Sequence, residues 1–181
     1  MKLFITRHGE TDWNVQKRTC GWSESQLTER GHAQAEALAK RLELMQKQND
    51  IQKIYVSPLK RARDTASYIE RALCLKAVPD ERIKEVHFGK MENVFWEKAP
   101  DFWHIKDNPF MRFPEGESLV QAAHRAYSLI EEVRDLNAGG NVLFVCHGMI
   151  TILMTTYFKS ASQDELYGLR IDNCQLLEFE L

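Results

Sequence analysis

The chain has 181 residues, of which 44% are hydrophobic and 28% are charged, and its formal net charge at pH 7 is −2. This length suits one α/β domain with a buried core, so we expect a single domain over residues 1–181. Because there is no overall positive excess, the charge argues against a large electrostatic surface for nucleic acid or for an anionic membrane.

Strand and helix patterns alternate along the first half of the chain. Thr28 is a suitable N-cap for a helix, because apolar side chains repeat at helical spacing behind it. The expected elements are a strand over residues 2–6, a loop over 13–26, a helix over 28–48, a strand over 51–56, a helix over 59–73 and a brief strand over 76–78.

The second half begins with an aromatic, irregular segment over residues 94–113. Ser118 is placed to cap a long helix, which we expect to end at Asn137-Ala-Gly-Gly. The nearly continuous apolar run NVLFVC over 141–146 is typical of a strand that is covered on both faces. A helix over 149–158 and an alternating edge strand over 175–180 complete the predicted elements.

This alternation predicts a three-layer α/β/α sandwich with a mostly parallel central sheet and an edge strand at the C-terminus. In such sheets the reacting groups gather at the carboxyl ends of the strands. His8 and His147 both directly follow an apolar strand and directly precede a glycine. We therefore expect the two imidazoles to lie at the same edge of the sheet.

The sequence around His8 is suited to phosphoryl transfer. Arg7 offers a guanidinium that can bind phosphate oxygens with two parallel hydrogen bonds, and Gly9 allows a substrate to approach the backbone. Asn14 and Arg18 follow closely. Taken alone, the same residues also fit a surface histidine beside unrelated charges.

Two further segments are weaker signals by themselves. Arg61 lies in the first turn of a predicted helix, where free N–H groups and the helix dipole favour anions. However, a run of charged residues such as KRARD is usually the solvent-exposed face of a helix. Glu85 lies in the segment IKEVHFGKME, and a lone glutamate there would be read as a surface residue.

Together these segments resemble the histidine phosphatase (phosphoglycerate mutase-like) superfamily over essentially the whole chain. The motifs that carry the resemblance appear in the family's order: RHGET at 7–11, GxxxxxLTxxG at 21–31, SPLKRARDTA at 57–66, ExxFGxxE at 85–92 and HG at 147–148. The resemblance implies a phosphatase that works through a phosphohistidine at His8, with Glu85 as proton donor and then general base. The other residues that it implies in substrate or phosphoryl binding are Arg7, Asn14, Cys20, Gly21, Arg61, His147 and Gly148.

The chain departs from the family pattern at several positions. Cys20 stands where many relatives have glutamine, and Glu24 and Gln26 replace the usual aspartate and proline. Met91 and Asn93 replace residues of the common FGxWEG ending. None of these changes removes a core group, but they weaken any inference about the substrate.

The residue types fit the reaction because cationic side chains can neutralise the oxygens of a phosphate ester in the transition state. Neutral imidazole is a good nucleophile near pH 7, and neighbouring guanidinium groups should lower the pKa of His8. We therefore expect no metal and no other cofactor. A metal-dependent hydrolase remains an alternative, and so does a phospho-ligand-binding module without catalysis.

The compact chain favours hydrolysis over phosphoglycerate mutase-type transfer, which remains the main alternative. It resembles α-ribazole phosphatases and broad-specificity phosphatases. The aromatic segment forms either a lid over the pocket or ordinary core packing. If it forms a lid, an organic or aromatic alcohol moiety fits better than a small polyanion.

The expected partner is a small-molecule phosphate ester, with no nucleic acid and no membrane, for a monomer or homodimer. The four cysteines include no CxxC pair, and the first residues lack the features of a signal peptide. We therefore expect the protein in the cytoplasm.

Overall fold

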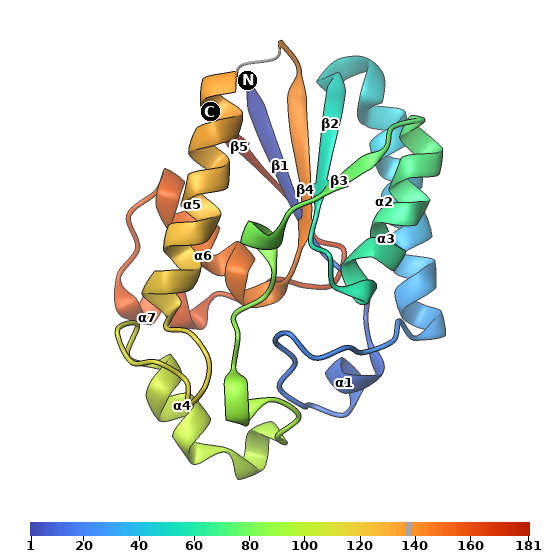
Figure 1. The fold of residues 1–181 in the computed structure, drawn as a ribbon. Helices are drawn as coiled ribbons and strands as arrows, with labels where there is room; N and C mark the ends of the chain where they lie inside the picture. The colour runs from blue at the N-terminus through green and yellow to red at the C-terminus, as the bar shows by residue number, and fades with distance from the viewer. Residues whose placement is uncertain (137–138) are drawn as a thin grey trace.

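The structure is a computed structural model, and it describes residues 1–136 and 139–181. Its centre is a five-stranded sheet with the order β3-β2-β4-β1-β5 (Figure 1). The strands are β1 (Lys2–Arg7), β2 (Ile51–Val56), β3 (Ala77–Pro79), β4 (Asn141–Cys146) and β5 (Leu176–Glu180). All neighbouring strands are parallel except β5, which pairs antiparallel with β1 at the edge. The predicted three-layer α/β/α fold with a C-terminal edge strand is confirmed.

Helices cover both faces of this sheet. In Figure 1, α5 and α6 lie on one side, and α2 and α3 on the other. The helices are α1 (Asp12–Val15), α2 (Glu29–Asn49), α3 (Lys60–Leu73), α4 (Pro100–Lys106), α5 (Leu119–Leu136), α6 (Gly148–Phe158) and α7 (Gln163–Gly168). The described part of the chain also contains three short 3-10 helices, η1 (Glu81–Ile83), η2 (Gly89–Met91) and η3 (Trp96–Lys98).

The strand periodicity explains the two layers of the core. In β1, Leu3 and Ile5 pack into the cluster that includes α5 and α6, whereas Phe4 packs into the cluster that includes α2 and α3. Because successive side chains of a strand point to opposite faces, an apolar run such as NVLFVC fills both clusters at once. The sheet is therefore buried on both sides, and its strand ends are fixed in place.

The structure contains two short helices that the sequence pattern did not predict. The expected loop over 13–26 overlaps α1, where Thr11 and Asn14 form a capping box. Helix α7 was not predicted, and it begins with a capping box between Ser162 and Glu165. The segment expected to be irregular over 94–113 also contains η3 and α4. The predicted end of α5 at Asn137 lies outside the described residues.

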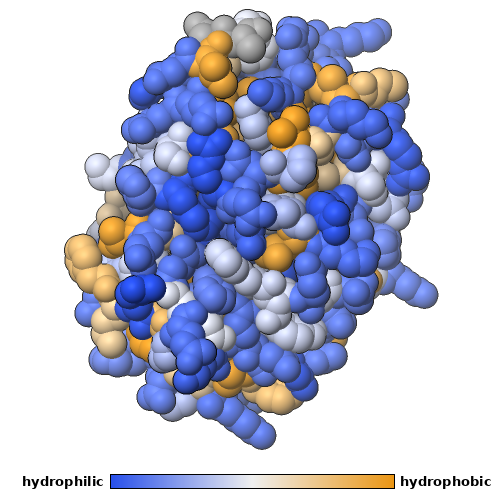
Figure 2. All heavy atoms as spheres, in the orientation of Figure 1, coloured by the Kyte–Doolittle hydropathy of each residue, from blue (hydrophilic) through white to orange (hydrophobic). Residues whose placement is uncertain are grey.

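The helices α1, α4 and α7 lie beyond the carboxyl ends of the parallel strands (Figure 1). The face shown in Figure 2 is mostly hydrophilic, with hydrophobic residues in small separate patches. Over residues 1–136 and 139–181, no helix combines the length and the apolar character needed to cross a bilayer.

Candidate active site

His8 and His147 meet at the carboxyl ends of β1 and β4. These strands are parallel neighbours, and the His8 N–H donates to the carbonyl of Cys146 at 3.0 Å. The two imidazole rings are 5.2 Å apart between centroids, in an edge-to-face arrangement. Both side chains are buried. The structure thus brings together the two histidines that the sequence pattern paired.

The hydrogen bonds of His8 define which ring nitrogen is available for chemistry. Its Nδ1 lies 2.7 Å from the carbonyl oxygen of Gly9, and this nitrogen must carry the proton because a carbonyl only accepts. Its Nε2 therefore carries a lone pair, which accepts a hydrogen bond from Nε of Arg61 at 3.2 Å. Burial, together with the guanidinium groups of Arg61 and Arg7, holds the pKa of His8 well below 6.5.

Arg61 is fully buried in the first turn of α3, and main-chain carbonyls hold its guanidinium. Nη1 donates to Ser23 at 2.9 Å, and Nη2 donates to Gly21 at 2.6 Å and to Cys20 at 3.4 Å. These acceptors belong to the loop of residues 20–23. The loop therefore fixes the plane of the guanidinium that faces His8.

Glu92 determines the shape of the 20–23 loop. Its carboxylate accepts from the main-chain N–H groups of Trp22 at 2.7 Å and Ser23 at 2.8 Å, and from that of Gly21 at 3.3 Å. A Cβ atom at Gly21 would lie 2.3 Å from the carbonyl oxygen of Val86, so only glycine fits there. The last glutamate of the ExxFGxxE motif thus supports Arg61 through the loop.

The side chain of His147 contacts Ser57, at the carboxyl end of β2. Its Nε2 lies 2.7 Å from the Ser57 hydroxyl oxygen, and its Nδ1 is buried with no hydrogen-bond partner among the described residues. Burial, with Arg61 and other neighbouring groups, holds the pKa of His147 well below 6.5. A neutral ring that accepts from the Ser57 hydroxyl at Nε2 carries its proton on Nδ1.

Arg7 lines the pocket between β1 and the C-terminal segment. Its Nη1 donates to the carbonyl of Ile171 at 2.7 Å, while its buried Nε has no partner within residues 1–136 and 139–181. Arg7 Nε is therefore a buried donor close to His8, and His147 Nδ1 is a second one in the tautomer whose Nε2 accepts from Ser57. Such donors are the groups that a phosphoryl anion requires.

Glu85 lies at the N-terminus of α6. Its carboxylate accepts main-chain N–H bonds from Val86 and Ile150 at Oε1, and from Met149 at Oε2. His147 is the N-cap residue of α6 but makes no side-chain capping bond, so Glu85 satisfies the free N–H groups instead. This places the carboxylate on the N-terminal turn that follows His147, in the wall of the same cavity as Arg7 and His8.

A cavity of about 440 Å³ is lined by Arg7, His8 and Glu85, whereas Arg61 and His147 lie behind its wall and do not line it. Three of the predicted substrate-binding residues line it beside Arg7 and His8, namely Asn14, Cys20 and Gly148. Gly21 does not line it, because its carbonyl binds Arg61 and its N–H binds Glu92. A direct contact between Gly21 and substrate stays a prediction.

The aromatic segment contributes both to the cavity wall and to the core. Trp96, Phe102 and Trp103 line the cavity. Phe113 is 1% exposed and packs edge-to-face against Phe88, with ring centroids 5.0 Å apart. The segment therefore lines the cavity and also packs in the core, and its role as a lid stays a prediction.

Several supporting residues were missed from the sequence. Ser57 had a signal, because it directly follows β2, just as His8 and His147 directly follow β1 and β4. Thr65 accepts from the N–H of Gly9 at 3.0 Å, and Asn173 donates to the carbonyl of His8 at 2.9 Å. Those two contacts span 56 and 165 residues, so no local pattern reveals them. Among the described residues, no three or more His, Cys, Asp or Glu side chains are grouped to bind a metal.

Comparison with known proteins agrees with this geometry. The model of the histidine phosphatase superfamily (branch 1) matches residues 3–181. The curated relatives include the probable phosphoglycerate mutase GpmB of Yersinia pestis (strain Pestoides F), 33% identical over 97% of this chain and 83% of the relative. The resemblance inferred from the motifs is thereby confirmed.

Solved structures share the fold. A mycobacterial glucosyl-3-phosphoglycerate phosphatase in complex with VO3 is 26% identical with a TM-score of 0.86, covering 98% of this chain and 91% of that one. The α-ribazole phosphatase of Shigella flexneri is 23% identical with a TM-score of 0.83, covering 100% of this chain and 91% of its own. At that identity, the second comparison bears on the fold alone.

Proposed function

Because the chain belongs to the histidine phosphatase superfamily (branch 1), a family of phosphatase enzymes, we propose that it hydrolyses small organic phosphate monoesters through a phosphohistidine at His8. The observation that carries this proposal is the hydrogen bond from Arg61 Nε to His8 Nε2 at 3.2 Å. It pairs a neutral imidazole lone pair with a cation, the two kinds of group that attack and bind a phosphoryl group, and this pairing supports the proposal.

In the first step, the hydrogen bond from Arg61 Nε to His8 Nε2 breaks as the phosphate binds. Nε2 then attacks phosphorus, and the bond from phosphorus to the ester oxygen breaks. Glu85, in its protonated form, gives its proton to the departing alkoxide, so that an alcohol leaves. In the second step, Glu85 takes a proton from water as the water oxygen attacks phosphorus. The bond between phosphorus and Nε2 then breaks and inorganic phosphate is released.

The hydrogen bonds of Glu85 indicate which of its oxygens carries the proton. Oε1 accepts two main-chain bonds, from Val86 and Ile150, and so both of its acceptor positions are used. Oε2 accepts one bond, from Met149, which leaves one position open. We assign the transferred proton to Oε2.

The transferring oxygens are stabilised by cations and by one neutral donor. Arg7 and Arg61 supply guanidinium groups, and His147 supplies its buried Nδ1–H. Asn14 assists from the cavity wall, where Cys20 and Gly148 border the substrate. These side chains neutralise the phosphate without a metal ion in the proposed reaction.

The cavity favours an ester whose alcohol moiety is apolar. Beyond the histidines its wall includes four aromatic residues and further aliphatic ones. Burying an aromatic ring contributes about 1.5–3 kcal/mol, which corresponds to roughly a tenfold or larger preference in affinity. Aryl phosphates and apolar alkyl phosphates should therefore be better substrates than glycerol phosphate.

The test is phosphate release by the purified chain from a panel that includes naphthyl phosphate, glycerol phosphate and 3-phosphoglycerate, with His8→Ala as the blank. We expect kcat/KM for naphthyl phosphate to be about tenfold or more above that for glycerol phosphate, in part because naphtholate leaves more readily than an alkoxide, so two variants isolate the contribution of the cavity wall. Trp103→Ala should reduce this preference. Phe110→Ala should not, because this aromatic residue of the same segment is 78% exposed and does not line the cavity.

The relatives named probable phosphoglycerate mutase make phosphoryl transfer between positions of phosphoglycerate the second candidate. The same panel separates the two activities. Interconversion of 3- and 2-phosphoglycerate without phosphate release from any ester would reject the hydrolase and favour the mutase.

A further inference from the structure

The main chain that carries Glu85 has no regular secondary structure to hold it. Residues 84–88 lie between η1 and η2, outside any helix or strand. Buried carbonyl groups that lack a helix or sheet partner need another donor. We call residues 82–87, which begin with the last two residues of η1, the Glu85 segment.

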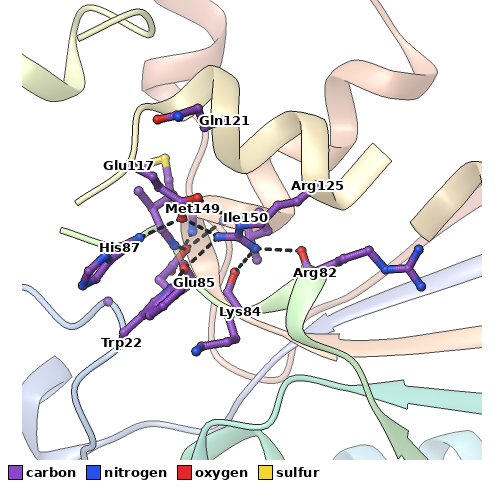
Figure 3. A network of polar contacts seen from close by, with 12 residues as sticks. Trp22, Arg82, Lys84, Glu85, His87, Glu117, Gln121, Arg125, Met149 and Ile150 are labelled. Carbon is purple, nitrogen blue, oxygen red and sulfur yellow. Dashed lines mark hydrogen bonds and ion pairs between the residues drawn. The ribbon is translucent and has the colours of Figure 1, made fainter. Parts of the chain in front are cut away.

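Arg125, on α5, supplies those donors. Its Nη1 donates to the carbonyls of Arg82 and Lys84, each at 2.7 Å, and its Nη2 donates to the carbonyl of Glu85 at 2.9 Å. Figure 3 shows the guanidinium between α5 and this segment, with hydrogen bonds to the carbonyls of Arg82, Lys84 and Glu85. One side chain therefore replaces the hydrogen bonds that a strand neighbour would provide.

Glu117 holds Arg125 in this orientation. Arg125 Nη2 lies 2.6 Å from Glu117 Oε1, and Arg125 Nε donates to Oε2 at 3.1 Å. The same Oε1 accepts the main-chain N–H of His87 at 2.9 Å. The side chains of this pair are only 18% and 15% exposed, so the fork-like contact is largely protected from water.

Trp22 contacts the Glu85 carbonyl from the other side. Its indole Nε1 donates to this oxygen at 2.7 Å (Figure 3). The indole stacks on the His87 ring with centroids 4.4 Å apart, and Lys84 Nζ lies 3.5 Å from the indole centroid. Trp22 also belongs to the 20–23 loop, whose carbonyls bind Arg61.

We propose that Arg125 and Trp22 are positioning residues for Glu85: two donors on its main-chain carbonyl fix where its carboxylate meets the leaving group. This inference rests on the proposed function. Trp22 connects Glu85 to the 20–23 loop, whose carbonyls bind Arg61. The proposed proton donor and the proposed phosphoryl-binding cation are therefore held by the same loop. Misplacement of a catalytic group by about 1 Å can cost roughly 100-fold in rate.

The test compares leaving groups. An alkoxide needs the proton from Glu85 and 4-nitrophenolate does not, so loss of Glu85 alignment should lower kcat for an alkyl phosphate more than for 4-nitrophenyl phosphate. We expect Arg125→Met to raise the ratio of aryl to alkyl kcat by about tenfold, since general acids contribute about 10²–10⁴-fold. Arg125→Lys should give a smaller rise, and so should Trp22→Phe, which keeps the stack but removes the N–H donor.

Arg82→Met is the matched control. The Arg82 side chain also joins the same segment to α5, through Glu132 at 2.8 Å, but it does not contact Glu85. It should leave the aryl-to-alkyl ratio unchanged. In a Glu85→Gln background, Arg125→Met should add nothing further to the ratio, because the acid is already lost.

Equal losses on both esters in Arg125→Met and Trp22→Phe would overturn the proposal. So would a rise in the ratio in Arg82→Met of the same size as in Arg125→Met. If Arg125→Met does not fold, as judged by thermal unfolding, Trp22→Phe decides the outcome by the same ratio. Glu85→Gln is measured first: if it leaves the ratio unchanged, the acid role in the proposed function is itself wrong.

Discussion

Arg61 and His8 are joined by a hydrogen bond from Nε of the guanidinium to Nε2 of the imidazole, 3.2 Å long. Guanidinium is always protonated in proteins, so the imidazole nitrogen that faces it has to be the unprotonated one. The opposite ring nitrogen is held by the carbonyl of Gly9. The contact therefore fixes the tautomer before any substrate binds, and it has to be exchanged for phosphate when Nε2 attacks.

Arg61→Lys tests this contact. Lysine keeps the positive charge, but it cannot reproduce the fork that binds His8 and the carbonyls of the 20–23 loop at the same time. We expect kcat/KM for 4-nitrophenyl phosphate to fall by about 10²–10³-fold, as for loss of a main anion-stabilising donor. Arg63→Lys, an exposed change on the same helix, should have little effect. Equal activity in both variants would exclude a special role for Arg61.

The pH profile of kcat/KM tests the protonation state of the free enzyme. Burial, Arg61 and Arg7 lower the pKa of His8, so the nucleophile stays neutral at pH values below 6.5. We expect activity to remain on its plateau from pH 7.5 to pH 6.5 and to fall only in more acidic buffer. A decline that is half complete at or above pH 6.5 would show that the pKa is not lowered.

The two buried histidines also predict a dependence of stability on pH. Folding lowers the pKa of His8 and His147 below 6.5, so in acid the unfolded chain binds more protons than the folded one. The contribution of the two histidines to the free energy of unfolding is therefore fully present above pH 6.5. It decreases as the pH falls below 6.5, by up to about 1.4 kcal/mol per pH unit for each histidine.

Urea unfolding at pH 7.5 and pH 5.5 measures this decrease. His8→Asn removes one of the two groups and should roughly halve the difference between the two pH values. The same free energy of unfolding at both pH values in the unaltered chain would refute the linkage.

Gly21→Ala tests the packing behind Arg61. The new Cβ would lie 2.3 Å from the Val86 carbonyl oxygen and 2.4 Å from Glu92 Oε1, so the loop has to move. We expect a loss of about 1–3 kcal/mol in the free energy of unfolding, together with lower kcat/KM. Gly168→Ala is the control because a Cβ there meets nothing within 4 Å. If both variants behave alike, tight packing at Gly21 is not required.

Most of the fold was predictable because its signals are local. The run NVLFVC marks β4 with its observed bounds, and Thr28 caps α2 as expected, accepting from the N–H of Gly31 at 3.0 Å. Helices α1 and α7 were missed although each starts with a capping box. Each is shorter than two turns, and helices of that length depend on tertiary contacts more than on their own sequence.

The residues of the site also divide into those with a local sequence signal and those without one. His8 and His147 were found because a strand, a histidine and a glycine follow one another in both places, and Arg61 because it begins a helix after a strand. The role of Arg125 had no local signal, since it contacts the Glu85 carbonyl 40 residues away only after α5 packs beside η1. Side chains that bind main-chain groups across such separations cannot be identified from periodicity or motif spacing.

The most direct test of the central claim is a rapid-quench experiment with ³²P-labelled substrate, followed by mapping of the labelled peptide. We expect an acid-labile, base-stable phosphoryl group on Nε2 of His8, formed within one turnover and absent in His8→Ala. Rapid turnover with no labelled protein at any time, or label on another residue, would contradict the account.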